Sequence, residues 1–157
     1  MHIDEVQILA ELAHQDGKKV VLVTGVFDIL HSEHSLFLEK ARALGDVLLV
    51  GIECDERVKK MKGQGRPIHS AVVRLGKLEK WGIAAAVFIL PEEFDAVDDY
   101  RLLLNRLQPS LLAVSSHSPH LDSKRQLMAE VGGEVVIVHQ HNPAVSTTIL
   151  LEKRRSG

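Results

Sequence analysis

Two histidines, His31 and His34, stand three residues apart shortly after an apolar run at residues 20–23. Between this run and the histidines lies Gly25, whose missing Cβ lets the backbone come close to a ligand. Ser32 is a suitable N-cap for the helix that follows, because its hydroxyl can accept a backbone N–H. In open α/β sheets the amide groups of such a helix start face a bound phosphate. The spacing therefore predicts an anion-binding pocket between a strand and a helix.

Further imidazoles follow two later apolar runs, at residues 111–115 and 134–138. If these runs are parallel strands, their carboxyl ends lie at the same edge of a sheet, and the imidazoles converge there. The imidazoles are those of His31, His34, His117, His120, His139 and His141. Together with the Glu33 carboxylate they could bind a transition metal, since imidazole suits Zn, Ni, Cu or Fe. The alternative is that they bind phosphates, substrate or water.

Apolar runs alternate with helical patterns along the chain. The predicted strands cover residues 20–23, 46–52, 85–90, 111–115 and 134–139. The predicted helices cover residues 3–14, 33–44, 55–62, 71–81, 100–107, 121–131 and 146–153. Nearly all-apolar strands are typical of a parallel sheet covered on both faces, and parallel strands need crossover connections. The sequence therefore predicts an α/β fold with a doubly wound, five-stranded parallel sheet.

Size and charge narrow the class of protein. A length of 157 residues suggests a single domain over residues 1–157, and a net charge of −2 argues against a general nucleic-acid binder. The one cysteine, Cys54, excludes an internal disulfide and fits a reducing compartment. No apolar run reaches the roughly 18 residues of a membrane span, and residues 1–16 lack a signal-peptide pattern. A cytoplasmic protein without a membrane partner is expected.

Three segments resemble one known family. Residues 25–34, GVFDILHSEH, are similar to the G-x-F-D-x-x-H-x-G-H signature of the cytidylyltransferase-like nucleotidyltransferases, with Glu33 in place of the last glycine. Residues 62–68, KGQGRPI, resemble the K-G-x-x-R-P-I loop of the bacterial heptose-1-phosphate adenylyltransferase branch, with Arg74 matching a later arginine. Residues 146–148, STT, resemble the start of the family's last helix. The resemblance implies a Rossmann-like fold with strand order 3-2-1-4-5.

The implied reaction is nucleotidyl transfer from ATP or CTP to a small phosphorylated sugar or alcohol, with release of pyrophosphate. By the same resemblance His31, His34 and Lys62 would be the catalytic residues, because they would donate to the phosphates as charge builds. Asp28 is expected to orient its loop. The nucleotide- and phosphate-binding residues would be Gly25, Val26, Phe27, Asp28, Arg66, Arg74, Ser115, His117, Ser146, Thr147 and Thr148. Mg²⁺ is expected with the triphosphate, held mostly by phosphates and water, and a homodimer is the implied assembly.

The chain departs from the family at three places. A Glu33 carboxylate facing a triphosphate would cost several kcal/mol, on the order expected from Coulomb's law at an effective dielectric of about 20. The loops at residues 114–120 and 139–143 also differ, which leaves the base open and makes His120, His139, His141 and Glu33 candidate substrate or metal contacts. Two alternatives follow: a nucleotide- or phosphometabolite-binding module without turnover, and a metal-dependent phosphohydrolase that uses the histidines.

Overall fold

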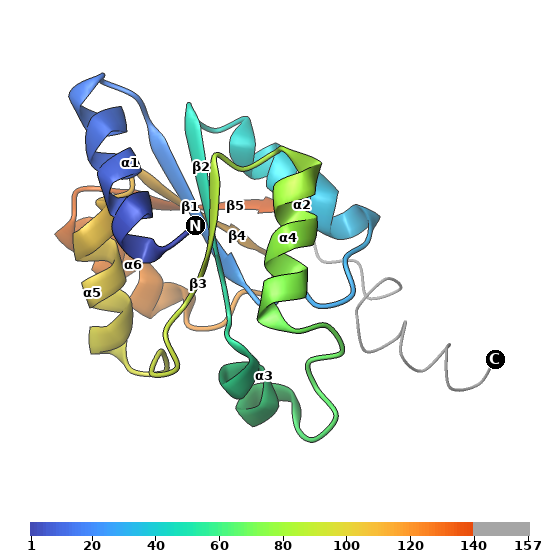
Figure 1. The fold of residues 1–157 in the computed structure, drawn as a ribbon. Helices are drawn as coiled ribbons and strands as arrows, with labels where there is room; N and C mark the ends of the chain where they lie inside the picture. The colour runs from blue at the N-terminus through green and yellow to red at the C-terminus, as the bar shows by residue number, and fades with distance from the viewer. Residues whose placement is uncertain (140–157) are drawn as a thin grey trace.

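A computed structural model describes residues 1–139, which form five parallel strands and six helices. The strands are β1 (Val20–Gly25), β2 (Val47–Ile52), β3 (Ala86–Ile89), β4 (Leu111–Ser115) and β5 (Glu134–His139). The helices are α1 (Ile3–Gln15), α2 (Ser32–Arg42), α3 (Asp55–Lys62), α4 (Ala71–Trp81), α5 (Val97–Leu107) and α6 (Leu121–Glu130). All ladders are parallel and the strand order is β3-β2-β1-β4-β5, as predicted (Figure 1).

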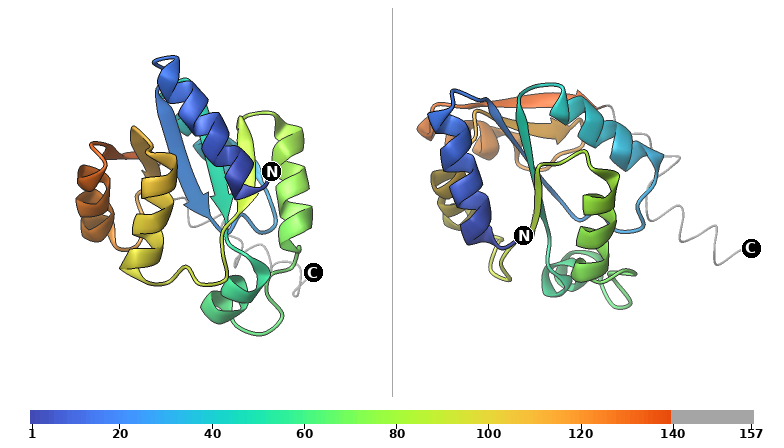
Figure 2. Two further views of the ribbon diagram at one scale, coloured as in Figure 1. Left: turned by 60° about the vertical axis from the view of Figure 1, so that its left-hand side comes forward. Right: turned by 45° about the horizontal axis from the view of Figure 1, so that its top comes forward.

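Helices cover both faces of the sheet (Figure 2). On one face α1, α5 and α6 pack on a core that includes Leu22, Phe88 and Leu112. On the other face α2 and α4 pack on a core that includes Val21 and Val50. Alternate residues of the strands thus point into two separate apolar layers, which explains why the strands are apolar at nearly every position.

Two helices begin earlier than predicted. α2 begins at Ser32 rather than after it, because His31 is the N-cap and its Nδ1 accepts the backbone N–H of Glu33. α5 begins at Val97 rather than at residue 100, since the Asp99 carboxylate accepts the N–H of Ala96 and closes the first turn. The predicted helix at 146–153 lies outside the described residues.

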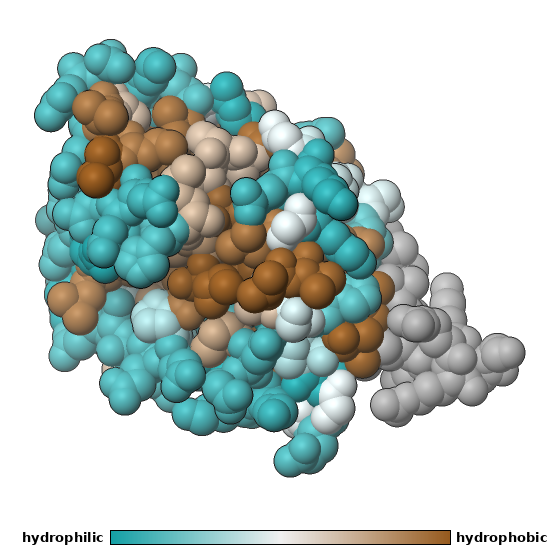
Figure 3. Space-filling view, in the orientation of Figure 1, coloured by the Kyte–Doolittle hydropathy of each residue, from teal (hydrophilic) through white to brown (hydrophobic). Residues whose placement is uncertain are grey.

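The edge strand β3 lies on the face seen in Figure 1, between α1 and α4. Apolar side chains gather across this face in Figure 3. The exposed large apolar residues of these three elements are Ile8, Leu12, Val72, Val73 and Ile89. None of the helices within residues 1–139 is long and apolar enough to cross a bilayer.

Candidate active site

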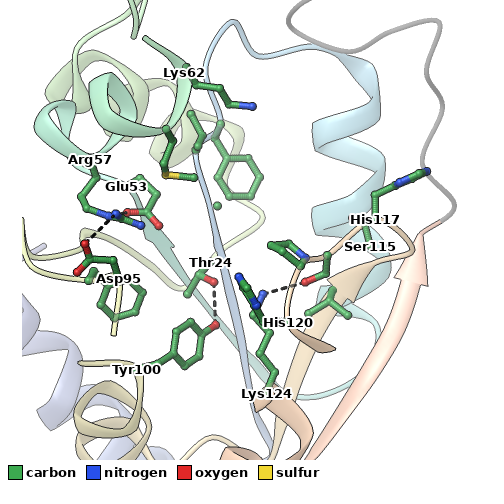
Figure 4. Close-up of a pocket in the computed structure, with 18 of the residues that line it drawn as sticks. Thr24, Glu53, Arg57, Lys62, Asp95, Tyr100, Ser115, His117, His120 and Lys124 are labelled. Atoms are coloured by element: carbon green, nitrogen blue, oxygen red, sulfur yellow. Dashed lines mark hydrogen bonds and ion pairs between the residues drawn. The ribbon is translucent and has the colours of Figure 1, made fainter. Parts of the chain in front are cut away.

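A cavity of about 820 Å³ opens at the carboxyl ends of the central strands (Figure 4). Its walls come from the segments that follow β1, β2, β3 and β4 and from the start of α6. Ligand cavities in proteins commonly measure about 300–1,000 Å³. The residues that were expected at the site and line this cavity are Gly25, Val26, Phe27, Asp28, His31, Glu33, His34, Lys62, Arg66, Ser115, His117 and His120.

His31 and His34 cap α2 together. The Nδ1 of His31 accepts the N–H of Glu33 at 3.2 Å, and the Nδ1 of His34 accepts the N–H of His31, also at 3.2 Å. Since a backbone N–H can only donate, each Nδ1 must be unprotonated and each Nε2 carries the proton of the neutral ring. The two rings lie with centroids 4.0 Å apart. The caps therefore leave two Nε2–H donors on side chains that line the cavity.

Burial keeps this pair neutral. Loss of hydration, together with the neighbouring His31 ring, lowers the pKa of His34 to about 4, and Asp28 opposes this shift. Burial also lowers the pKa of His31, against the attraction of Glu33. At neutral pH the pair therefore offers hydrogen-bond donors without positive charge. The cationic side chains expected to meet phosphates are instead Lys62 and Arg66.

Asp28 is a structural tie between two loops. Its side chain is buried, with 1% of the residue exposed, and its carboxylate accepts the backbone N–H groups of Ile68 at 2.7 Å and His69 at 2.9 Å. The Nε of Arg66 lies 3.6 Å from the same carboxylate. The Arg66 Nε is buried and makes no hydrogen bond to the described residues. Asp28 therefore joins the segment after β1 to residues 66–69, and its role in orienting the loop stays a prediction.

The structure corrects the expectation that Arg74 could fork onto phosphate oxygens. Arg74 is fully buried in α4 and does not line the cavity. Its guanidinium donates to the carbonyls of His69 at 2.9 Å, Val26 at 2.7 Å and Glu53 at 2.8 Å, and to Asp55 Oδ1 at 2.9 Å. Its guanidinium thus binds three backbone carbonyls and the Asp55 carboxylate, and Arg74 shapes the site without reaching it.

Gly25 also has a structural reason to be glycine. A Cβ at this position would lie 2.9 Å from the Phe27 ring. Phe27 is buried and packs into the α2–α4 core with a backbone φ of 54°. Gly25 therefore makes room for an aromatic ring of its own loop, and because it also lines the cavity its close approach to a ligand stays a prediction.

The predicted gathering of imidazoles holds for four of the histidines. His31, His34, His117 and His120 all line the cavity. Within residues 1–139, however, no three His, Cys, Asp or Glu side chains are grouped so that they could hold a metal ion. Of His139 only the backbone is described, as the last residue of β5. His141, Ser146, Thr147 and Thr148 lie outside the described residues.

Sequence reasoning missed one polar side of the cavity, whose residues come from β1, α3, α5 and α6 and from the segments after β2 and β3. We call this side the polar wall, and it consists of Thr24, Glu53, Arg57, Asp95, Tyr100 and Lys124, all of which line the cavity (Figure 4). Glu53 directly follows β2, just as His31, His117 and His139 follow or end other strands. The same rule of strand ends, applied to β2, would have found it.

The doubly wound sheet and the cavity at its carboxyl edge define a Rossmann-like α/β protein, the class whose ligands bind outside the ends of parallel strands. Within that class the family is shown by sequence. The cytidylyltransferase-like family model matches residues 22–153. The chain belongs to the cytidylyltransferase-like nucleotidyltransferases.

The curated relatives are longer proteins. The chain is 35% identical over 148 residues to the bifunctional protein HldE of Actinobacillus pleuropneumoniae serotype 5b, a match that covers 94% of this chain and 30% of that protein. It is 33% identical over 160 residues to the HldE of Yersinia pestis strain Pestoides F, covering 100% of this chain and 32% of that protein. The chain thus spans about a third of the length of these relatives.

Solved structures agree on the fold. A lipopolysaccharide core biosynthesis protein from Thermoplasma volcanium GSS1 superposes with a TM-score of 0.64 at 23% identity, over 80% of this chain and 98% of that one. A pantoate-beta-alanine ligase from Francisella tularensis superposes with a TM-score of 0.68 at 13% identity, over 98% of this chain and 75% of that one. At these identities the likeness concerns the fold alone.

Proposed function

We propose that this chain transfers a nucleoside monophosphate from ATP or CTP to a small phosphorylated sugar, with release of pyrophosphate. The single observation that carries this proposal is the position of the His31–His34 pair: both side chains line the same cavity as Lys62 and Arg66, and their Nδ1 caps leave the proton of each neutral ring on Nε2. The family membership and the similarity to HldE support it. ATP is the preferred donor in the proposal, because the loop at residues 62–68 resembles the adenylyltransferase branch.

The chemistry asks for positioning and charge stabilisation. An oxygen of the acceptor phosphate attacks the α-phosphorus, a new P–O–P bond forms, and the bond to the β-phosphate breaks so that pyrophosphate leaves. Because the nucleophile is already anionic, no side chain has to remove a proton. The neutral imidazoles of His31 and His34 would donate to the α- and β-phosphates, while Lys62 would hold both substrates.

Mg²⁺ would accompany the triphosphate and neutralise part of its charge. The donor set of the described residues fits a metal held mainly by phosphate and water oxygens, because these residues form no three-ligand metal group of their own. The Asp28 carboxylate accepts from the backbone amides of Ile29, Ile68 and His69 and lies beside Arg66, which supports a structural role for it.

Pyrophosphate release tests the proposal. ATP and CTP would each be offered with heptose 1-phosphate, mannose 1-phosphate and glycerol 3-phosphate. The informative variants are His31→Asn and His34→Asn, because Asn Oδ1 can take over the capping role of Nδ1 while the Nε2–H donor is lost. We expect kcat to fall by about 100-fold or more in each. His2→Asn is the matched control, since His2 also caps a helix through Nδ1 but lies on α1, away from the cavity.

One observation favours a second candidate function. Glu33 lines the cavity, where its carboxylate would oppose a bound triphosphate. A module that binds a nucleotide without turnover would show saturable binding and no pyrophosphate with any acceptor. Release of phosphate or pyrophosphate in the absence of acceptor would instead identify a hydrolase. Either result overturns the transferase proposal.

A further inference from the structure

The polar wall contains charged groups whose hydrogen-bonding capacity is only partly used by the described residues. Glu53 is 8% exposed, and its backbone is fixed on both sides: its N–H donates to the Gly25 carbonyl at 2.9 Å and its carbonyl accepts from Arg74. Among the described residues its carboxylate accepts one hydrogen bond, from Arg57 Nε at a long 3.4 Å. A carboxylate has about four acceptor positions. Burial raises the pKa of Glu53 despite the nearby cations, and acceptor capacity remains on the side that lines the cavity.

Lys124 complements this carboxylate from the first turns of α6. Its ammonium donates to Ser118 Oγ at 2.8 Å and lies 5.8 Å from the centre of the Tyr100 ring. Within residues 1–139 no carboxylate oxygen lies within 4.0 Å of Lys124 Nζ. An ammonium carries three donors, so Lys124 can donate further into the cavity that it lines.

A pair of neutral hydroxyls lies between these charges. The Tyr100 hydroxyl and Thr24 Oγ1 are 2.9 Å apart, at the end of β1 (Figure 4). Burial raises the pKa of Tyr100 to about 12, so the phenol stays protonated. One of the two hydroxyls donates to the other, which leaves one donor and several lone pairs at this point of the wall.

The formal net charge of the polar wall is zero, because the carboxylates of Glu53 and Asp95 offset the cations of Arg57 and Lys124. Arg57 links both carboxylates, at 3.4 Å to Glu53 and 3.7 Å to Asp95. Such a wall does not favour a second anionic group, whereas it presents acceptors and donors side by side. Hydroxyl groups, each a donor and an acceptor, are the ligands that match this pattern.

We propose that the polar wall binds the hydroxyls of the acceptor, with Glu53 and Lys124 as the residues that select a phosphorylated sugar over a short phosphorylated alcohol. This inference rests on the proposed function, because it places the acceptor phosphate near Lys62 and the sugar ring against the wall. Glu53 accepts from ring hydroxyls, and Lys124 donates to their oxygens. A three-carbon acceptor anchored at the phosphate end offers fewer hydroxyls to these groups and gains less from them.

Steady-state kinetics with separate titration of each substrate tests the assignment. In Glu53→Gln and Lys124→Met we expect the KM for mannose 1-phosphate to rise by about 10- to 100-fold, the usual effect of losing a hydrogen bond to a charged group. The KM for the nucleotide should stay within twofold. Glu56→Gln and Lys59→Met are matched controls, because both residues are exposed on α3 and neither lines the cavity. Deoxy analogues of mannose 1-phosphate identify the hydroxyl that Glu53 binds. Removing that hydroxyl should raise the KM of the wild type but should add little to the KM that Glu53→Gln has already raised.

Two results would overturn the assignment: equal kcat/KM values of the wild type for glycerol 3-phosphate and mannose 1-phosphate, or an equal rise of both KM values in Glu53→Gln. Calorimetric titration of mannose 1-phosphate into the wild type and both variants separates failure of the transferase proposal from failure of the polar-wall proposal. Binding that weakens at least tenfold in the variants supports the wall even if no pyrophosphate is released. Absent binding to a wild type that also lacks turnover rejects both proposals.

Discussion

At the scale of single residues, the two motif histidines serve the backbone and the cavity at once. Nδ1 of each ring completes the cap of α2, which decides the tautomer and directs the proton to Nε2. A donor prepared in this way needs no reorganisation when phosphate charge develops. The capping box thus couples the stability of a helix start to the chemistry proposed for the cavity.

This coupling predicts a pH-dependent stability difference between the wild type and His34→Asn. The pKa of His34 is about 4 in the folded chain and about 6.5 when unfolded. Between these values the unfolded chain binds the proton and the folded chain does not, so the contribution of His34 is complete above pH 6.5 and is lost as the pH falls toward 4. Urea unfolding at pH 7 and pH 4 should show the wild type losing about 3 kcal/mol more than the variant.

The comparison with the variant is needed because other groups titrate in the same range. Burial raises the pKa of Glu53, which lowers stability as the pH rises above 4.5 and so acts in the opposite direction. This contribution is common to both proteins and cancels in the difference. Equal losses in the wild type and His34→Asn would show that His34 is not held neutral.

We expect substitution of Arg74 to lower the stability of the fold rather than to affect phosphate binding directly. Arg74→Met removes a fully buried guanidinium and leaves the carbonyls of Val26, His69 and Glu53 and the carboxylate of Asp55 without this donor, which should lower the free energy of unfolding by about 3 kcal/mol or more. Urea denaturation measures the loss. Arg101→Met is the control, since Arg101 forms only exposed ion pairs and should cost less than about 1 kcal/mol. If Arg74→Met left stability unchanged and weakened nucleotide binding, Arg74 would after all be a phosphate ligand.

At the scale of elements, two glycines with different surroundings test how the helices are placed. Gly76 lies inside α4, and a Cβ there would meet nothing within 4 Å. Gly76→Ala should therefore raise the stability by about 1 kcal/mol, because alanine favours a helix over glycine. Thermal unfolding measures the change, and a lower melting temperature would contradict the packing of α4.

Gly133 provides the contrasting case at the turn between α6 and β5. A Cβ there would lie 2.8 Å from the carbonyl oxygens of Pro109 and Ser110 and 2.6 Å from the Met128 side chain. Since backbone cannot yield as a flexible side chain can, Gly133→Ala should cost about 1–3 kcal/mol. An unaffected melting temperature would mean that the turn at Gly133 does not lie as close to residues 109–110 as described.

At the scale of the whole molecule, the two apolar cores share one sheet. Neighbouring residues of β1, such as Val21 and Leu22, point into opposite cores. Neither core can lose its strands without exposing the other, so the predicted single domain should unfold in one step. Calorimetric and van't Hoff enthalpies should agree, and near- and far-ultraviolet circular dichroism should report the same midpoint. Two separated transitions would contradict the single-domain prediction.

Much of this architecture follows from the sequence alone. The apolar runs locate all five strands, because a strand buried on both faces tolerates few polar residues. Local signals locate α4 with its Ser70 cap and its end at Gly82, which has the left-handed φ of 67° that glycine adopts at low cost. The strand order implied by the family resemblance is confirmed. The motif residues at 25–28, 31 and 34 line the cavity, and their roles stay predictions.

The roles of individual polar side chains were decided by tertiary structure. The sequence suggested Ser32 as a helix cap and Arg74 as a phosphate ligand. The cap is instead made by His31 through a local bond from the N–H of Glu33. Contacts with distant segments bury Arg74 and use its guanidinium. Glu53 and Lys124 are 71 positions apart and share a cavity wall only because β2 and α6 meet at one edge of the sheet. Hydrophobic periodicity and turn residues depend on residues that are close in the sequence. Burial, ion pairing and the direction of a side chain depend on which remote segments pack together.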